Sequence, residues 1–128
     1  MILDSSALVA IALDEPEREA LIGKIDAAEA VGIAGPTLVE AGIVLSARTG
    51  ENASELLADL VEAADAVVIE FGAGHWETAL SAWWEYGKGR HPAALNLGDC
   101  IAYAAARVAG EPLLAIGDDF AQTDIELA

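Results

Sequence analysis

Short apolar runs alternate with longer stretches of helical periodicity, and this alternation restricts the fold more than any other feature of the chain. Runs with strand character lie at residues 1–3, 31–34, 66–69 and 113–116, with a weaker final run at 125–127. Strands that alternate with helices of about ten residues or more predict βαβ units around a parallel sheet. Right-handed crossovers between such strands place helices on both faces of the sheet. We therefore expect an α/β fold.

The predicted helices follow from apolar periodicity and from helix-ending residues. Pro36 stands at a favoured first helical position, and Gly50 and Gly110 end helices. Asp14 is expected to cap a helix whose first turn is acidic. No repeat or long linker divides the chain, so residues 1–128 are expected to form a single domain. The expected helices cover residues 6–13, 14–30, 36–49, 52–64, 75–86 and 98–108.

The net charge of −16 sets this chain apart from ordinary nucleic-acid binders. Only six Lys and Arg stand against 22 Asp and Glu, whereas a nucleic-acid interface usually shows a basic patch. Two explanations remain open at this point. The acidic surface attracts a basic protein partner, or the acidity is common to the whole proteome and carries no information about mechanism.

The chain has the features of a cytoplasmic protein. No apolar run reaches the roughly 20 residues of a membrane helix, and the start lacks the basic region of a secretory signal. The single cysteine, Cys100, cannot form an internal disulfide, which favours a reducing compartment. We interpret Cys100 as a structural position within a helix.

Separated acidic residues stand where an α/β fold can collect them. Asp4 follows the first strand, Glu40 lies just inside the helix that Pro36 begins, and Asp99 opens a later helix. Asp118 and Asp119 follow the strand at 113–116. Ligands gather outside the carboxyl ends of parallel strands. Carboxylates held about 5 Å apart repel by roughly 3 kcal/mol per pair, and a hard cation such as Mg²⁺ or Mn²⁺ removes that repulsion.

Each of these acids also has a local interpretation. Asp4 can cap the first helix and Asp99 a later one, and the Asp118–Asp119 pair suits a turn. Glu40 is the least ordinary, because its neighbours are apolar and buried Glu is rare unless it is paired or ligating. The metal-site hypothesis therefore depends on all four positions reaching one crevice.

Three stretches of the chain resemble PIN-domain ribonucleases, and most closely the toxin component of VapBC-type toxin–antitoxin pairs. The likeness covers essentially the whole chain without an insertion. The three stretches are MILDSSALVA at residues 1–10 followed by DEPE at 14–17, GKGRHPAALNLGDC at 87–100, and PLLAIGDDFAQTDI at 112–125.

The resemblance implies a three-layer α/β/α sandwich and a Mg²⁺-dependent endoribonuclease, with Mn²⁺ as a substitute. It implies Asp4, Glu40 and Asp99 as the acidic core of the site, with Asp4 and Asp99 as the surest metal ligands. Asp119, directly before Phe120, is the expected fourth acid, and Asp118 ranks second. The implied role is the toxin of a type II toxin–antitoxin system, homodimeric and neutralised by a cognate antitoxin whose carboxyl-terminal part wraps around it.

Further residues are interpreted from their own chemistry. Lys88, Arg90 and His91 form the one basic cluster, in a glycine-containing loop before Asp99, and are predicted to contact RNA phosphates; the alternative is a loop made soluble by charge. Ser5 or Ser6 is expected to orient Asp4, or to cap the helix. His75 is interpreted as a helix-start residue.

Three tryptophans lie in one predicted helix. Trp76, Leu80 and Trp83 share a helix face, which is the ordinary pattern of core residues. Trp84 is rotated by about 100° from Trp83, and is predicted to be partly exposed at a dimer or antitoxin surface.

Two other functions compete with the ribonuclease. A doubly wound phosphoacceptor or phosphohydrolase usually carries a second Asp two residues after the nucleophilic one, but Ser6 occupies that position. A non-catalytic interaction domain is disfavoured because all four acidic positions are filled. Metal-dependent cleavage of RNA separates the first hypothesis from both alternatives.

Overall fold

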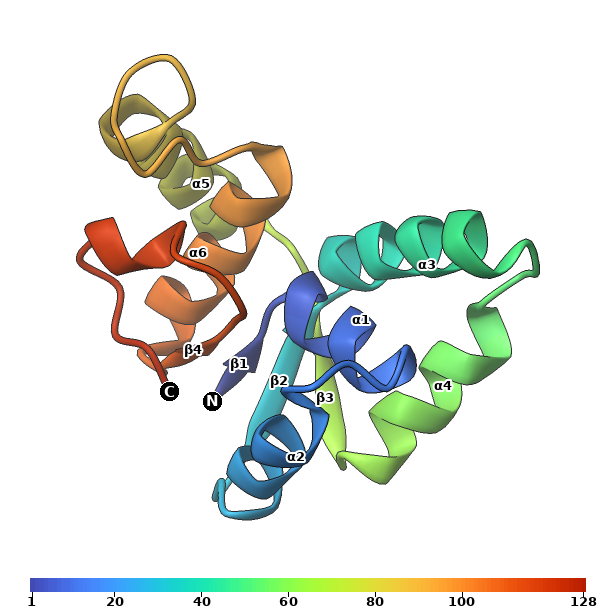
Figure 1. The fold of residues 1–128 in the computed structure, drawn as a ribbon. Helices are drawn as coiled ribbons and strands as arrows, with labels where there is room; N and C mark the ends of the chain where they lie inside the picture. The colour runs from blue at the N-terminus through green and yellow to red at the C-terminus, as the bar shows by residue number, and fades with distance from the viewer.

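Four short parallel strands form the centre of the molecule, in the order β3-β2-β1-β4 (Figure 1). The computed structural model describes residues 1–128. Ile2 of β1 lies opposite Gly32 of β2 on one side and Leu113 of β4 on the other. The strands are β1 (Ile2–Leu3), β2 (Val31–Ala34), β3 (Ala66–Ile69) and β4 (Leu113–Leu114).

Helices cover both faces of this sheet, which confirms the α/β fold and its three layers. Four helices pack on one face and two on the other, around separate apolar clusters. A short 3₁₀ helix, Phe120–Gln122, follows β4. The first face carries α1 (Ser5–Ala12), α2 (Arg18–Asp26), α3 (Gly35–Thr49) and α4 (Ser54–Ala63), and the second carries α5 (Ala73–Tyr86) and α6 (Leu97–Ala109).

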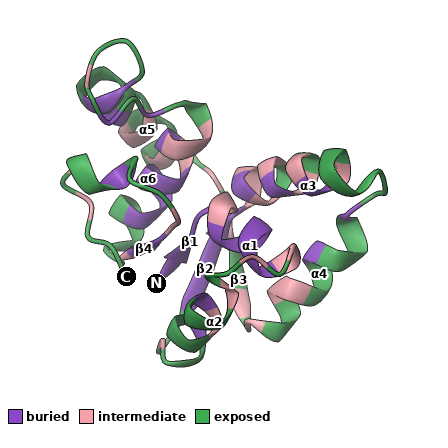
Figure 2. Cartoon of the chain, viewed as in Figure 1, coloured by how far each residue is buried: buried purple, intermediate pink, exposed green.

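The alternation of side chains along each strand divides the core between the two faces. Leu3 and Leu114 point into the cluster under α1 to α4, whereas Ile2 and Leu113 point into the cluster under α6. All four side chains are almost completely buried. Figure 2 shows the buried strands β1 and β2 at the centre, with β3 partly exposed at the edge.

The strand order places a crevice at the carboxyl end of β1. The chain moves outward from β1 to β2 and β3, and then returns to add β4 on the opposite side of β1. Ligands of open α/β sheets bind at such a reversal of strand order. Asp4 directly follows β1, and its main-chain N–H donates to Leu114 of β4 at 2.9 Å.

Several predicted boundaries were wrong. The second helix begins at Arg18, because Asp14 adopts a left-handed φ of 55° and turns the chain. The same helix ends at Asp26, short of the predicted residue 30. The strand at 113–116 has only two residues, and the weak final run forms a single bridge between Leu127 and Leu113.

The prediction that Trp76, Leu80 and Trp83 form a core face of α5 was also wrong. They are 55%, 58% and 39% exposed, whereas Ala82 and Tyr86 are buried. The buried face is the one rich in small residues, because alanines allow α5 to lie close against the alanine-rich α6. Trp84 is 67% exposed, as predicted. Each helix of the protein falls short of the length and apolar character that a membrane-spanning helix needs.

Candidate active site

Asp4 is the most deeply buried acid of the protein, with 4% of its surface exposed. It is the N-cap of α1, and its Oδ2 accepts hydrogen bonds from the Ser6 N–H at 3.0 Å and the Ser6 hydroxyl at 2.6 Å. Its Oδ1 is buried and has no hydrogen-bond partner. A buried carboxylate oxygen without a partner destabilises the folded protein. The unpartnered Oδ1 is therefore available to a ligand in the crevice.

Ser6 links Asp4 to the chain that leaves β4. Its hydroxyl donates to Asp4 and accepts from the main-chain N–H of Ile116 at 3.0 Å. Ile116 lies shortly before the Asp118–Asp119 pair. This arrangement supports the prediction that a serine orients Asp4, and it identifies that serine as Ser6.

Glu40 lies in the second turn of α3, and its carboxylate faces the first turn of α6. A Cβ atom at Gly98 would overlap both carboxylate oxygens of Glu40, so Gly98 allows this approach. The amino end of α6 carries partial positive charge, which favours a carboxylate there. Burial and the charge of Asp4 raise the pKa of Glu40, while a hydrogen bond from Ser5 lowers it.

Asp99 is held by a reciprocal pair of hydrogen bonds at the start of α6. Its Oδ2 accepts from the Asn96 N–H at 2.9 Å, and the Asn96 Oδ1 accepts from the Asp99 N–H at 2.9 Å. Burial raises the pKa of Asp99 to about 6; the Asn96 N–H lowers it, and the charges of Asp4, Asp119 and Glu40 raise it. Asp99 thus caps α6 and also feels the charges of Asp4, Asp119 and Glu40.

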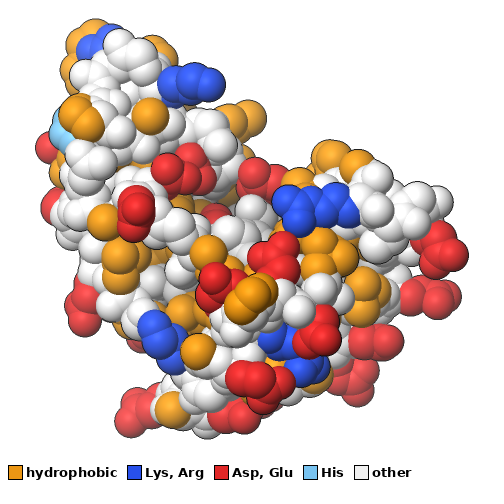
Figure 3. All heavy atoms as spheres, in the orientation of Figure 1, with side chains coloured by type: hydrophobic (Ala, Val, Ile, Leu, Met, Phe, Trp, Pro, Cys, Tyr) orange, Lys and Arg blue, Asp and Glu red, His pale blue; other side chains and the backbone are white.

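These interactions bring four of the predicted residues into one electrostatic neighbourhood, which we call the acid cluster. Figure 3 shows acidic side chains around the hollow between the α6 side and the α3 side of the molecule. The charge of Asp119 is among those that raise the pKa of Asp99, and the ranking of Asp119 over Asp118 as the fourth acid stays a prediction. The acid cluster consists of Asp4, Glu40, Asp99 and Asp119.

The chemistry of this donor set fits a hard divalent cation, since every side chain offers carboxylate oxygen. Within this set, the Oδ1 of Asp4 is buried and has no hydrogen-bond partner inside the protein. As the side chains lie, no three His, Cys, Asp or Glu groups are close enough together to hold a metal ion. Carboxylates repel one another when no cation lies between them, so a small closure of the side chains is expected on binding.

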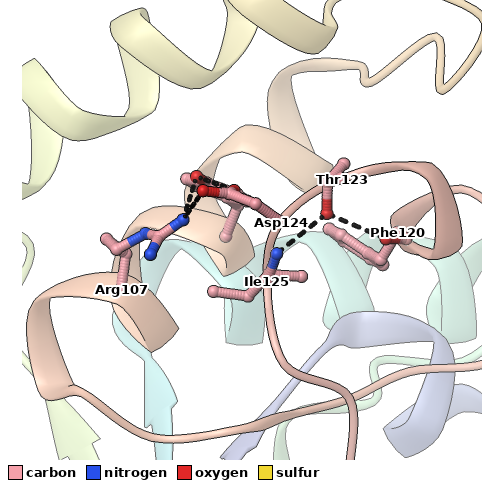
Figure 4. Close-up of polar contacts among 6 residues, drawn as sticks. Arg107, Phe120, Thr123, Asp124 and Ile125 are labelled. Carbon is pink, nitrogen blue, oxygen red and sulfur yellow. Dashed lines mark hydrogen bonds and ion pairs between the residues drawn. The ribbon is translucent and has the colours of Figure 1, made fainter.

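The segment that carries Asp119 is anchored away from the acid cluster (Figure 4). The Tyr103 hydroxyl donates to the Asp124 Oδ1 at 2.7 Å and accepts from Arg107 at 2.8 Å, and Arg107 also pairs with Asp124. The hydrogen bond from Tyr103 and the charge of Arg107 lower the pKa of Asp124. These contacts tie the end of the chain to α6. Asp119 itself is exposed.

The basic loop is more ordered than its sequence indicates. The His91 Nδ1 accepts from the Ala93 N–H at 3.1 Å, and its ring packs edge-on against Tyr86. His91 thus shapes the loop. Lys88 and Arg90 are exposed, and the RNA contacts of all three residues stay a prediction. His75 accepts from the Gly72 N–H at 3.1 Å, which confirms that it caps the start of α5.

Sequence reasoning missed three features of this region. Gly98 carries no local signal, because its contact is with a helix 58 positions away in sequence. Tyr103 and Arg107 are one turn apart on α6, and this spacing is visible in the sequence. Their contact with Asp124 is not, because only tertiary packing brings Asp124 to α6. Thr37, in the first turn of α3, is buried and its hydroxyl has no partner.

The chain matches the model of the PIN-domain family over residues 1–126. Ribonuclease VapC36 of Mycobacterium tuberculosis is 42% identical over 127 residues, covering 98% of this chain and 91% of the relative. Ribonuclease VapC of Mycolicibacterium smegmatis is 39% identical over 125 residues, covering 98% and 97%.

Solved structures share the whole fold. VapC20 of Mycobacterium tuberculosis, a toxin that cleaves the sarcin–ricin loop, superposes with a TM-score of 0.80 at 17% identity, covering 99% of this chain and 97% of that one. A toxin–antitoxin complex from Klebsiella pneumoniae contains a chain with a TM-score of 0.72 at 18% identity, covering 99% and 95%. At these identities the superpositions describe the fold.

Proposed function

The chain belongs to the PIN-domain family, among the VapC ribonucleases, and from that premise we propose that its acid cluster binds Mg²⁺ or Mn²⁺ and hydrolyses RNA phosphodiester bonds. The observation that carries the metal proposal is the buried Oδ1 of Asp4, which has no partner within the protein. RNA as substrate follows from the ribonuclease family, and we propose the cytoplasm as the place of action.

Each residue of the acid cluster has a proposed task. Asp4 and Asp99 hold the cation, with Ser6 and Asn96 fixing their orientation. When bound, the metal makes hydroxide available near neutral pH and stabilises charge on the phosphate. The Glu40 carboxylate, whose pKa is raised, takes the proton of the attacking water. Asp119 contributes charge from the exposed edge of the crevice.

The test is cleavage of a fluorescent RNA by the purified protein in Mg²⁺, Mn²⁺ or chelator. We expect cleavage with either cation and none in chelator. Millimolar Mg²⁺ should also raise the melting temperature, since a ligand of the native state stabilises it, relative to a salt control of equal ionic strength. Cleavage that persists in chelator, or a melting temperature that Mg²⁺ does not move, contradicts the metal proposal.

We further propose that a cognate antitoxin neutralises the protein by occupying the apolar groove between α3 and α4. The groove has a volume of about 1180 Å³, and exposed Val39, Ile43 and Val68 line it together with acidic Glu51 and Glu62. An amphipathic segment with basic flanks complements this surface. The Klebsiella relative in fold comes from a toxin–antitoxin complex, which supports an antitoxin as the partner.

Association with the antitoxin should be fast at low salt and slower as salt screens the attraction. Stopped-flow mixing followed by tryptophan fluorescence across a salt series measures this rate. Ile43→Ser, which changes no charge, should weaken the complex without changing the salt dependence of the association rate. A rate that salt does not alter would leave proteome-wide acidity as the explanation of the −16 charge. Homodimerisation stays a prediction, with sedimentation as its measurement.

A further inference from the structure

The six Lys and Arg side chains of this acidic protein are unevenly neutralised. Three arginines form ion pairs with Asp or Glu, and one lysine donates to the main-chain oxygen of Ala128 at 2.7 Å. The remaining two, Lys88 and Arg90, have no acidic partner and share the loop between α5 and α6. The three ion-paired arginines are Arg18, Arg48 and Arg107, and the lysine bound to the main chain is Lys24, whose charge that hydrogen bond does not neutralise.

Arg90 is held against two exposed tryptophans of α5. Its guanidinium carbon lies 3.9 Å from the ring centre of Trp84 and 5.2 Å from that of Trp83. The Arg90 Nε–H donates to the Trp84 carbonyl at 2.9 Å, so the other guanidinium N–H groups have no partner in the protein. Trp84 is 67% exposed, which leaves much of its indole open to solvent. We call Trp83, Trp84, Lys88 and Arg90 the tryptophan–arginine platform.

The platform is ordered before any ligand arrives. The Lys88 N–H donates to Leu95 at 3.0 Å, and the Leu95 N–H donates to Tyr86 at 3.0 Å, closing the loop at its base. A Cβ atom at Gly87 would lie 2.6 Å from the Trp83 ring, so this glycine permits the indole to pack against the loop. A surface that is already ordered loses less conformational entropy on binding.

The platform lies close to the acid cluster along the chain. Lys88 is hydrogen-bonded to Leu95, and Leu95 precedes Asp99 by four residues. The hydrogen-bonded main chains of Lys88 and Leu95 are about 5 Å apart, and the four residues from Leu95 to Asp99 span at most about 3.8 Å each. The main chains of Lys88 and Asp99 are therefore at most roughly 20 Å apart. A short single strand of RNA can contact both.

We propose that the tryptophan–arginine platform is a binding subsite for an unpaired stretch of RNA, a proposal that rests on RNA being the substrate. Bases stack on the Trp84 indole and the Arg90 guanidinium plane, and phosphates contact Lys88. Single-stranded nucleic acid is bound in this way because every base has an aromatic face that stacks. Base stacking favours unpaired RNA over a duplex, in which the bases are already stacked and covered.

A protein partner fits this surface less well. An interface that buried Lys88 and Arg90 would need to bring a carboxylate to each, because an unpaired buried charge is strongly destabilising. The chain around them carries a net charge of −16 and repels phosphate. RNA that approaches the protein is therefore attracted most strongly at Lys88 and Arg90, where two positive charges without an acidic partner lie in one loop.

The experiment measures fluorescence anisotropy of a labelled 12-nucleotide oligouridine, and of a labelled 12-base-pair RNA duplex, in Mg²⁺. An Asp99→Asn background prevents cleavage during the titration, and a gel verifies that the probe is intact. We expect Trp84→Ala to weaken binding of the single strand about tenfold, with little change for the duplex. Trp84→Phe should retain most of the affinity, because a stacking face remains.

Trp76→Ala is the matched control, since Trp76 is on the same helix and 55% exposed but has no cation over its ring. It should leave oligouridine binding unchanged. Lys88→Gln should lower the slope of log Kd against log salt by about 0.7, the value for one single-strand phosphate contact. Equal losses from Trp76→Ala and Trp84→Ala, or no loss from Trp84→Ala, overturn the proposal.

Three further outcomes are distinguishable. If sedimentation shows that Trp84→Ala converts a dimer into a monomer, the surface is an interface between copies and the proposal is wrong. If the parent protein cleaves RNA and Trp84→Ala cleaves it with the same KM, the platform fails while the ribonuclease function stands. If oligouridine binding depends on Trp84 but no RNA is cleaved, the proposed function fails while the platform stands.

Discussion

Asp4 and Asp119 both act on the pKa of Asp99, but the two acids are positioned in different ways. Asp4 is buried, and both of its hydrogen-bond donors come from a residue two positions away. Asp119 is exposed and has no side-chain hydrogen bond of its own. Its segment is held by Asp124, which Tyr103 and Arg107 fix to α6.

The difference shows that acids of one site can depend on unlike forces. Asp4 is buried and is held by hydrogen bonds from Ser6, two positions away. Removing the charge of Asp4 or the hydroxyl of Ser6 should therefore change the site directly. The position of Asp119 depends on the buried Phe120 beside it and on a partly exposed ion pair, and exposed pairs stabilise a protein by at most about 1 kcal/mol. Substitutions that affect Asp4 and substitutions that affect Asp119 should therefore differ in the size and in the kind of their effects.

The largest expected difference is between the two acids themselves. Asp4→Asn should lower cleavage by roughly a thousandfold or more, because a metal ligand contributes several kcal/mol to transition-state stabilisation. Asp119→Asn should lower it by roughly tenfold, since water can replace an exposed carboxylate. Single-turnover cleavage rates in saturating Mg²⁺ provide the measurement. Asp118→Asn is the matched control and should be close to the parent. Equal losses of cleavage in Asp4→Asn and Asp119→Asn would show that the two acids do not differ in importance.

Breaking the local support of Asp4 should have the next largest effect. Ser6→Ala removes the 2.6 Å hydrogen bond to Asp4 and the acceptor of the Ile116 N–H. We expect a loss of about 10- to 100-fold in cleavage and of about 1–2 kcal/mol in the free energy of unfolding. Ser6→Thr, which keeps the hydroxyl, should recover most of both quantities. Denaturant unfolding and cleavage assays on the same samples test this, and an unaffected cleavage rate in Ser6→Ala argues against the orienting role.

The distant support of Asp119 should matter less, and only through Asp119. Arg107→Gln should lower cleavage a few-fold and the free energy of unfolding by less than about 1 kcal/mol, because both partners of the ion pair are partly exposed. In an Asp119→Asn background, the same substitution should have almost no further effect on cleavage. A double-mutant cycle measures this coupling, and additive losses would show that Arg107 acts by another route.

The smallest expected effect is on the pH dependence of stability in the metal-free protein. The pKa of Asp99 is raised from its ordinary value of 3.8 to about 6, chiefly by burial. The folded state therefore holds the proton more tightly than the unfolded state, and the stability from this group is lost as pH rises from about 4 through 6. In chelator, Asp99→Asn should melt a few degrees above the parent at pH 7 and close to it at pH 4. A difference that does not grow with pH would contradict the raised pKa.

Much of the fold was predictable because it depends on local patterns. The four strands and the approximate extents of α1, α3, α4, α5 and α6 follow from apolar periodicity, Pro36, Gly50 and Gly110. The start of α2 was wrong because Asp14 ends α1 in a left-handed conformation, with the Glu15 N–H donating to the Ala10 carbonyl at 3.0 Å, and so does not cap the next helix. The exposure of Trp76 was missed because amphipathicity identifies an apolar face but not which face another helix covers.

The sequence by itself determined which acids stand at strand ends and helix starts, and hence which residues can meet in the crevice. Strand order, the approach of Glu40 to Gly98 and the anchoring of Asp124 by Tyr103 and Arg107 were decided by the tertiary structure alone. The physical reason is range. Capping and periodicity act within a few residues, whereas these contacts join segments that only packing around the sheet brings together.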